Sequence, residues 1–263
     1  MKENYTHISV VLDKSASMGI LSGSTIEGFN SFLMAQKEVE GEATMTLVQF
    51  ANNTETVMEA EPVESADELN SRTYRANGGS TSLLDALGRT MNSTETQIED
   101  MEEESPEKVI FVVITDGEEN SSREFNRSQI MEMINRHREE DGWEFVFIGA
   151  NQDAIQSGGG MGIRAGATLS YDQSAIGTRS MYMSLDNSMT NYRSKCVADT
   201  INADFFTEPA LDANIDKEEL LNKNPNPNAK IKGQFQNMYI DTRNDMAETK
   251  DTEEVEETEE TDK

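Results

Sequence analysis

The sequence contains few cysteine, histidine and tryptophan residues: one cysteine, two histidines and one tryptophan in 263 residues. The single thiol, Cys196, cannot form a disulfide within the chain, so we expect no disulfide framework. Two isolated histidines, His7 and His137, are more typical of structural or surface positions than of a ligand or a catalytic base. These scarcities exclude the disulfide-rich secreted class and argue against histidine-based catalysis.

Positive charge and long apolar runs are scarce as well. There are 22 Lys and Arg residues against 50 Asp and Glu residues, a formal net charge of −28. A surface that binds nucleic acid needs clustered basic residues, so we expect no nucleic-acid partner. No apolar run approaches the roughly 20 residues that span a bilayer, and the first residues lack the pattern of a signal peptide. We therefore expect no membrane partner and a cytoplasmic location.

The length suits one sizeable α/β domain with appendages. We predict a domain over residues 1–195, a C-terminal extension over 196–240 and an acidic disordered tail over 241–263. The tail is rich in Glu and nearly devoid of apolar residues, a composition that stays solvated. Its charge serves solubility or docking, and the sequence leaves both roles open.

Apolar patterns of two periods alternate along the predicted domain. Runs typical of strands occur at 6–12, 45–50, 55–58, 109–114, 144–149 and 167–169, and patterns typical of helices at 24–38, 83–98, 127–140 and 172–193. Because strands alternate with helices, we predict an α/β fold: a doubly wound, mostly parallel central sheet with helices on both faces. The two runs joined at Asn52 and Asn53 predict one antiparallel edge strand.

The segment Asp13-Lys14-Ser15-Ala16-Ser17 directly follows the first predicted strand. One carboxylate and two hydroxyls at this spacing suit one side of a hard cation such as Mg²⁺, which prefers oxygen ligands. Asp and Ser are also common at helix N-caps, where they accept hydrogen bonds from unpaired amides. The segment alone is therefore either part of a metal site or a helix cap.

Two later segments have oxygen-bearing residues at similar junctions. Thr81 lies in Gly78-Gly79-Ser80-Thr81-Ser82 before a predicted helix, and Asp116 ends the apolar run at 109–114. Thr81 alone could be a helix cap, and Asp116 alone could belong to a simple turn. If the strands before Asp13 and Asp116 are parallel, both carboxylates lie at the same edge of the sheet.

Together, the three segments resemble the von Willebrand factor type A domain, in which they form the metal-ion-dependent adhesion site. The similarity extends from about Tyr5 to about Arg193 and is greatest to the stand-alone cytoplasmic bacterial or phage type. The five positions of the family's motif are all matched in this sequence, by Asp13, Ser15, Ser17, Thr81 and Asp116.

The resemblance implies a Mg²⁺ or Mn²⁺ ion held by the hydroxyls of Ser15, Ser17 and Thr81, with Asp13 and Asp116 binding directly or through water. Hydroxyl ligands neutralise little charge, so the ion stays open to an external anion. In the family this anion is commonly an Asp or Glu of a partner protein. We therefore expect a non-catalytic, metal-dependent protein-binding module. Because the chain is so acidic, we expect a partner carboxylate within a basic surface, or slow association.

Other functions are compatible with parts of the pattern. Related proteins serve as adaptor subunits of ATPase or chelatase-type assemblies, and a stress-response or phage-encoded accessory factor is a further alternative. Haloacid-dehalogenase-like phosphatases also have an Asp-led loop, but Ser15 replaces their second Asp and cannot act as a general acid or base at neutral pH. The sequence also lacks the Gly-x-x-x-x-Gly-Lys loop that is typical of nucleotide hydrolysis. We interpret the glycine-rich residues 158–162 as a flexible turn.

Three charged residues adjoin the motif. Lys14 is interpreted as a solvated loop residue, with a contact to the partner as the alternative. Glu118 and Glu119 follow Asp116 and are expected at the rim of the metal site, where they would retain the cation or compete for its open position.

Overall fold

The computed structural model describes residues 1–117, 119–150, 154–200 and 203–206. The chain divides into two units, Met1–Asn214 and Ile215–Lys263, and the described residues all belong to the first. The predicted acidic tail and most of the predicted extension lie outside the described residues, so the domain boundaries stay predictions. Within the described part, no helix is long and apolar enough to cross a membrane.

Six strands form one sheet in the order β3-β2-β1-β4-β5-β6. The β2–β3 pair is antiparallel and the other neighbours are parallel. The predicted fold class, a mostly parallel sheet with one antiparallel edge strand, is confirmed. The strands are β1 (Lys2–Asp13), β2 (Glu42–Phe50), β3 (Thr54–Pro62), β4 (Pro106–Thr115), β5 (Glu144–Ala150) and β6 (Thr168–Tyr171).

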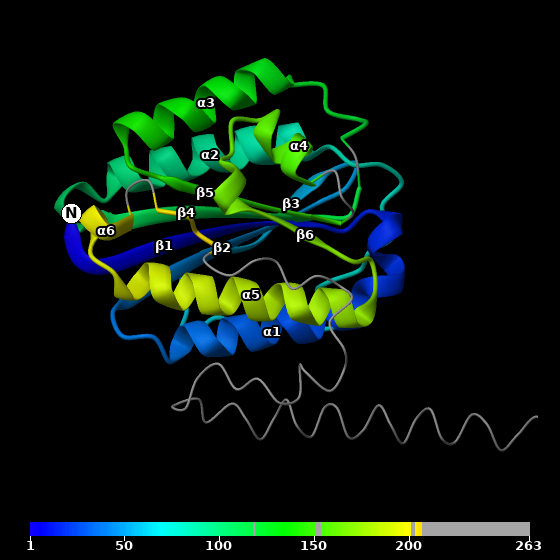
Figure 1. The fold of residues 1–263 in the computed structure, drawn as a ribbon, viewed down its shortest axis with the longest axis horizontal. Helices are drawn as coiled ribbons and strands as arrows, with labels where there is room; N and C mark the ends of the chain where they lie inside the picture. Colours follow the sequence, from blue (N-terminus) through cyan, green and yellow to red (C-terminus); the bar gives the residue numbers. More distant parts are fainter. Residues whose placement is uncertain (118, 151–153, 201–202, 207–263) are drawn as a thin grey trace, which may run out of the picture. The chain divides into compact units, whose positions relative to one another are not determined.

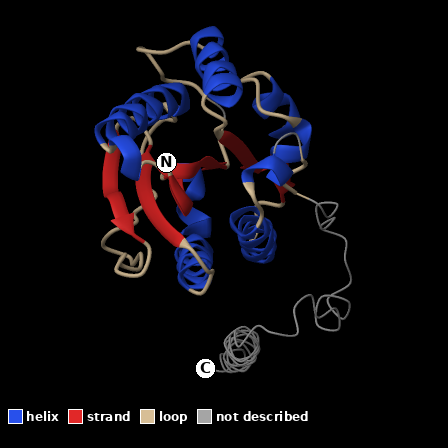
Figure 2. Ribbon diagram, turned by 90° about the vertical axis from the view of Figure 1, so that its left-hand side faces the viewer, coloured by secondary structure: helices blue, strands red, loops and turns tan. Residues whose placement is uncertain are grey.

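Helices cover both faces of this sheet, also as predicted (Figures 1 and 2). One face carries α1 (Ser22–Lys37) and α5 (Ala175–Ser194), and the other carries α2 (Leu83–Asp100), α3 (Arg127–Glu140) and α4 (Ala154–Gly159). The short elements are the 3-10 helices η1 (Ala16–Leu21), η2 (Glu102–Glu104) and η3 (Ala165–Ala167), and the helix α6 (Val197–Thr200).

The core is built around the central strands β1 and β4. Residues 5–13 of β1 are all buried, as are residues 108–115 of β4. The two strands run in parallel register, with Ile8 beside Ile110 and Val10 beside Val112. A continuous apolar, β-branched run is what a strand covered on both faces requires.

The helices α1 and α5 approach closely because Gly28 lies at their contact. A Cβ atom on Gly28 would lie 2.2 Å from the ring of Tyr182 in α5. Phe29, Phe32 and Leu33 of α1 are all buried, which confirms the apolar face predicted for this helix. Glycine is needed at this position because any side chain would collide with an aromatic ring.

Two short elements beyond the predicted set lie at the carboxyl ends of strands. The 3-10 helix η1 follows β1, and α4 follows β5 with its end at Gly159. The turn interpreted at 158–162 is partly right, since Gly160 to Gly162 leave the helix and Gly162 has a φ of +87°. Glycine has poor helix propensity, so α4 depends on tertiary packing rather than on local sequence.

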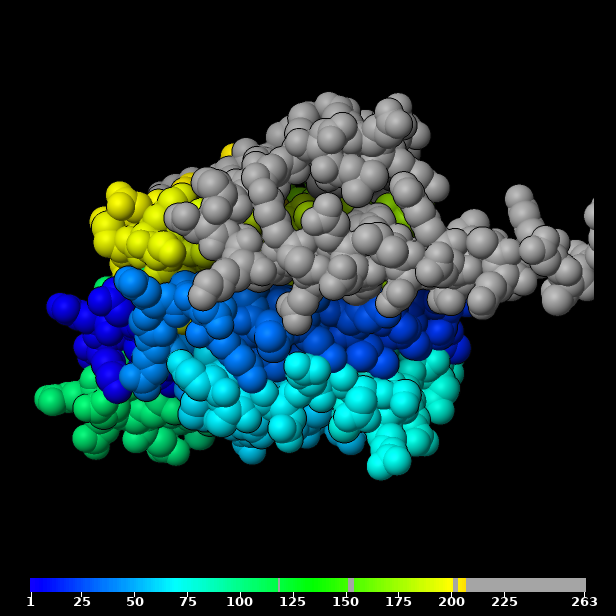
Figure 3. All heavy atoms as spheres, turned by 90° about the horizontal axis from the view of Figure 1, so that it is seen from below, coloured from blue at the N-terminus to red at the C-terminus, as the bar shows by residue number. Residues whose placement is uncertain are grey.

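The connection between β3 and α2 crosses from the amino to the carboxyl edge of the sheet along α1. Asn30 of α1 exchanges two hydrogen bonds with the backbone of Leu69, at 2.7 and 2.9 Å. Figure 3 shows this connection, in cyan, beside α1, in blue. The contact with α1 guides the chain toward the Gly78-Gly79 loop.

Candidate metal centre

In the strand order, β2 and β3 lie on one side of β1. The chain then returns to place β4 on the other side of β1. Adjacent connections therefore leave β1 and β4 in opposite directions. Asp13 ends β1 and Asp116 directly follows β4. Ligand sites of open α/β sheets lie at such a switch point, beyond the carboxyl ends of the strands.

The first loop holds the Asp13 carboxylate in a fixed orientation. Its Oδ1 accepts a hydrogen bond from the amide of Ser15 at 2.7 Å, and its Oδ2 accepts one from the hydroxyl of Thr115 at 2.6 Å. Asp13 is fully buried. Burial raises the pKa of its carboxyl above the ordinary value, while the hydrogen bonds from Thr115 and Ser15 partly offset that rise.

The second loop is joined to the first by backbone hydrogen bonds. The amide of Ala16 donates to the carbonyl of Gly78 at 2.8 Å, and the amide of Gly78 donates to the carbonyl of Lys14 at 3.2 Å. This short parallel bridge places Thr81 above the end of β1. Thr81 is buried, and its Oγ1 makes no hydrogen bond within the described part of the chain.

The third loop brings in the Asp116 carboxylate from β4. Its Oδ1 accepts a hydrogen bond from the hydroxyl of Ser17 at 2.7 Å, and the Oγ atoms of Ser17 and Ser15 lie 3.0 Å apart. Asp116 is half-buried and Ser17 is exposed. The cluster is therefore walled in by Asp13, Ser15 and Thr81 and open to solvent on the side of Ser17 and Asp116.

The oxygens of all three loops converge beside Gly117. A side chain on Gly117 would begin 3.2 Å from Oγ1 of Thr81, 3.7 Å from Oγ of Ser17 and 3.8 Å from Oδ2 of Asp13. The lack of a side chain at Gly117 thus leaves a space with oxygen atoms on several sides. Hydroxyl and carboxylate oxygens are the donors that Mg²⁺ and Mn²⁺ prefer, so the residues present fit such an ion.

The alternative interpretations of single residues do not account for this arrangement. Ser15 precedes η1, but its side chain makes no capping hydrogen bond. Ser82, not Thr81, precedes α2. Elsewhere in the described residues, no three His, Cys, Asp or Glu side chains group as a metal site. This cluster differs because three of its five residues, Ser15, Ser17 and Thr81, supply hydroxyls.

Three further residues hold the cluster, and sequence reasoning missed them. The amide of Gln173, between β6 and α5, donates to Oδ2 of Asp116 at 2.7 Å. The hydroxyl of Tyr74 donates to the backbone carbonyl of Asp13 at 2.7 Å. Asn120 exchanges two hydrogen bonds with the backbone of Thr81, at 3.0 and 3.1 Å. None lies within a recognisable spacing of the residue it contacts, so no local signal could have identified it.

The predictions for the charged neighbours were wrong where they can be assessed. Lys14 is largely buried and forms an ion pair with Glu55 of β3, so it is not a solvated loop residue. Glu119 turns away from the cluster and accepts hydrogen bonds from the amides of Leu84 and Ser122, at 3.0 and 2.7 Å. The first turn of α2 attracts this carboxylate because its amides have no partner within the helix. Glu118 lies outside the described residues.

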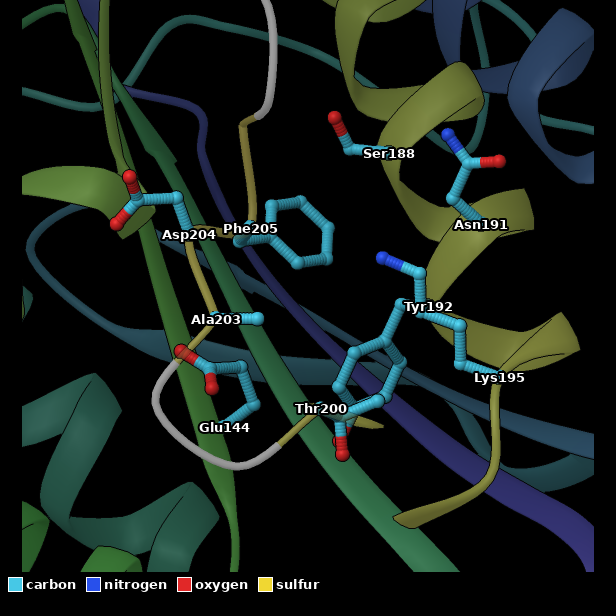
Figure 4. Close-up of a pocket in the computed structure, with 9 residues that line it drawn as sticks. All are labelled: Glu144, Ser188, Asn191, Tyr192, Lys195, Thr200, Ala203, Asp204 and Phe205. Atoms are coloured by element: carbon cyan, nitrogen blue, oxygen red, sulfur yellow. The ribbon is translucent and has the colours of Figure 1, made fainter. Parts of the chain in front are cut away.

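The histidines and a second hollow lie away from the cluster. His7 is buried in the middle of β1, where burial lowers its pKa to about 4, and His137 is buried in the last turn of α3. Figure 4 shows the hollow, which residues of β5, α5 and the following segment line. Glu144 in its wall is already paired with Arg164. This hollow offers no cluster of oxygens like that beside Gly117.

Fold and site together define a doubly wound α/β domain with hydroxyls and carboxylates gathered at the switch point of its sheet. The family model of the von Willebrand factor type A domain matches residues 7–164, and the chain belongs to this family. The resemblance inferred from the three motifs is confirmed. Members of this family bind proteins in a metal-dependent manner through the metal-ion-dependent adhesion site.

Several solved structures are similar to this chain. Proximal thread matrix protein 1 from the mussel byssus is 15% identical with a TM-score of 0.49, and the alignment covers 67% of this chain and 45% of that protein. A further structure of that mussel protein has zinc in its adhesion-site motif. The ArnB paralog VWA2 from Sulfolobus acidocaldarius is 16% identical with a TM-score of 0.45, covering 70% of this chain and 44% of that protein.

A von Willebrand factor type A protein from Catenulispora acidiphila is 12% identical with a TM-score of 0.45, over 70% of this chain and 42% of that one. This chain thus spans less than half of the length of each of these proteins. A search of curated protein sequences finds no significant match.

Proposed function

We propose that this protein is a non-catalytic binding module that holds Mg²⁺ or Mn²⁺ with Asp13, Ser15, Ser17, Thr81 and Asp116. A divalent cation held there supplies a positive charge that can accept a carboxylate oxygen from an Asp or Glu of a partner protein. The observation that carries the proposal is the convergence of oxygens from three separate loops beside Gly117.

The distribution of charge among these residues supports a binding role. Asp13 is buried and its carboxylate is already oriented by two hydrogen bonds, so it is prepared to bind a cation without rearrangement. The remaining donors are mainly neutral hydroxyls, which leave most of the cation's charge available to a ligand. Because Ser17 and Asp116 face solvent, a partner carboxylate has access from that side.

Among the described residues no histidine contacts the cluster, which supports a role without catalysis. Both histidines of the chain are buried, and neither is among the residues that contact the cluster. Ser15 occupies the position at which a phosphatase of the haloacid-dehalogenase type needs a second carboxylate. We therefore rank binding above phosphate-ester hydrolysis.

The proposal also covers the location of the protein and an alternative partner. A single cysteine is typical of a cytoplasmic protein, and we propose that location. An ATPase subunit remains the alternative partner, in which case the protein is an adaptor of an ATPase or chelatase-type assembly. Affinity capture in Mg²⁺ and in EDTA, with identification of the retained protein, distinguishes this adaptor role from other partnerships.

The metal site is tested by thermal unfolding in Mg²⁺ and in EDTA. The wild-type protein should unfold at a higher temperature in Mg²⁺, because a ligand that binds only the native state stabilises it. Asp116→Ala should lose this difference. Asp172→Ala is the matched control, since Asp172 is an exposed carboxylate that makes no side-chain hydrogen bond within the described residues. It should respond to Mg²⁺ like the wild type.

Two results would contradict the proposal. An Asp116→Ala variant with the full Mg²⁺ response would remove this residue from the site. Hydrolysis of a generic phosphomonoester by the wild-type protein, lost in Asp13→Asn, would show that the cluster is an active site of an enzyme instead.

A further inference from the structure

Three isoleucines are exposed at the edge of the sheet that carries the metal cluster. Ile20 in η1 exposes 81% of its surface, Ile155 in α4 exposes 56% and Ile176 in α5 exposes 43%. They belong to the connections that follow β1, β5 and β6. Single exposed apolar residues are ordinary on protein surfaces. Here, however, every exposed isoleucine of the described residues lies at the carboxyl edge of the sheet.

Ile20 and Ile176 belong to the elements that build the cluster. Ile20 lies three residues after Ser17 in the same 3-10 helix. Ile176 lies three residues after Gln173, which donates a hydrogen bond to the Asp116 carboxylate. Both side chains thus lie within a short stretch of chain of a residue that contacts the cluster.

Ile155 approaches from the opposite face of the sheet. Its neighbour Ala154 packs against Gly149, where an added Cβ would lie 2.9 Å away. Gly149 pairs in register with Thr115, the residue before Asp116. Aliphatic side chains from three separate connections are therefore exposed at the edge of the sheet where the metal cluster lies.

Three of the described carboxylates at this edge are engaged within the protein, although the whole chain is strongly acidic. Glu55 forms an ion pair with Lys14, and Glu27 forms one with Arg179. Glu119 accepts a hydrogen bond from an amide at the start of α2. Of the carboxylates named at this edge, only Asp172 is exposed without such a partner.

Two exposed cations lie on the connection that leads to this edge. Arg72 and Arg75 lie on the connection that leads to Thr81, and neither forms an ion pair within the described residues. The connection reaches η1 at Ala76, whose carbonyl lies 3.3 Å from the Cβ position of Gly19. These two arginines thus add positive charge to the connection that leads to Thr81.

We infer that the exposed isoleucines form an apolar rim, defined here as Ile20, Ile155 and Ile176, which binds a protein segment whose metal-binding Asp or Glu is flanked by large aliphatic residues. The inference rests on the proposed function, because the metal supplies the contact for the carboxylate. The rim supplies specificity: burying aliphatic side chains on both partners stabilises the complex. The nearby arginines disfavour basic flanking residues.

The test uses the full-length protein labelled with ¹³C at isoleucine methyl groups and saturated with Mg²⁺. The probe is the synthetic peptide acetyl-Ser-Gly-Leu-Leu-Asp-Leu-Leu-Gly-Ser-amide. Two control peptides replace the four leucines with serine or the aspartate with asparagine. Methyl resonances are followed by NMR during each titration, and the titrations are repeated in EDTA.

The inference predicts that the leucine peptide shifts the methyl resonances of Ile20, Ile155 and Ile176 in Mg²⁺ but not in EDTA. The serine and asparagine peptides should bind at least about fivefold more weakly, a factor equivalent to about 1 kcal/mol. Ile20→Ser should weaken the leucine peptide by a similar factor without changing Mg²⁺ affinity. Met34→Ser is the matched control because Met34, also exposed, lies near the far end of α1.

Two negative results separate the inference from the proposed function. If the leucine and serine peptides bind equally in Mg²⁺ and the rim methyls do not shift, the metal site binds carboxylates but the rim takes no part, and the inference fails alone. If Mg²⁺ binds but neither aspartate peptide does, both the inference and the proposed binding of carboxylates fail.

Discussion

Two buried tyrosines permit a matched test of how the metal loop is held in place. Tyr74 and Tyr182 expose 1% and 3% of their surface. The hydroxyl of Tyr74 donates to the backbone carbonyl of Asp13 at 2.7 Å, whereas the hydroxyl of Tyr182 has no hydrogen-bond partner among the described residues. Replacing either tyrosine with phenylalanine removes one hydroxyl and leaves an aromatic ring of nearly the same shape.

The expected changes in stability differ because the two hydroxyls have different partners. Tyr74→Phe removes a buried hydrogen bond and leaves a carbonyl without that donor, which costs roughly 1 to 3 kcal/mol of the free energy of unfolding. Tyr182→Phe removes a hydroxyl that gains no hydrogen bond on burial, so the variant should be as stable as the wild type or more stable. The difference between the two variants should exceed about 1 kcal/mol.

The assay is equilibrium unfolding in urea, carried out in EDTA so that metal binding does not contribute. Calorimetric titration with Mg²⁺ then measures metal affinity. Because Tyr74 fixes the backbone of Asp13, Tyr74→Phe should also weaken Mg²⁺ binding by about three- to fivefold, up to roughly 1 kcal/mol. Tyr182→Phe should leave Mg²⁺ affinity unchanged.

Equal losses of stability in the two variants would refute this reasoning, since they would reflect only the disturbance of a packed core. A Tyr74→Phe variant with reduced stability but unchanged Mg²⁺ affinity would show that the hydrogen bond stabilises the fold without positioning Asp13.

Three further predictions concern packing and charge in the rest of the described domain. Burial raises the pKa of Asp186 from 3.8 to about 6. The native state therefore binds the proton of this carboxyl more tightly than the unfolded chain does. The free energy of unfolding should thus fall by up to roughly 3 kcal/mol as the pH rises from about 4 to about 6. Urea unfolding across this range should show that contribution missing in Asp186→Asn, and identical pH profiles would contradict the assignment. Gly28→Ala should lower the free energy of unfolding by about 1 to 3 kcal/mol, because the added Cβ collides with Tyr182. Gly23→Ala in the same helix, where an added Cβ meets nothing within 4 Å, should be neutral or slightly stabilising. Thermal unfolding compares the two variants, and similar effects would contradict this packing. Lys108 is buried and donates to main-chain carbonyls at the end of α5, so Lys108→Met should lower the unfolding free energy by about 1 to 3 kcal/mol in urea, and a variant of wild-type stability would show that these carbonyls find other donors.

The sequence predicted the order of elements well because each signal is local. The apolar run at Val109 to Ile114 identifies a buried strand without knowledge of its neighbours. The helix predicted over Arg127 to Glu140 has the same bounds in the structure, where Asn126 and Gln129 form a capping box at its start. By contrast, η1 and α4 were missed because their sequences carry no helical periodicity or strong helix formers.

The candidate ligands were also accessible to sequence reasoning, since hydroxyls and carboxylates at fixed spacings after strands are local features. Glu119 shows the limit of that reasoning. Its position three residues after Asp116 suggested a place at the metal rim, but the unpaired amides of α2 lie close by and bind its carboxylate instead. Lys14 likewise forms an ion pair with Glu55, which is distant in sequence.

The sequence by itself thus determined the fold class and the residues that can act as ligands, because periodicity and short motifs depend only on neighbouring positions. The tertiary structure decided which distant residues hold those ligands and what surrounds them. Tyr74 reaches Asp13, Gln173 reaches Asp116, and the three exposed isoleucines gather at one edge, only because the order of the strands brings their connections together. Contacts between residues far apart in the chain depend on the sheet order, which no single segment encodes.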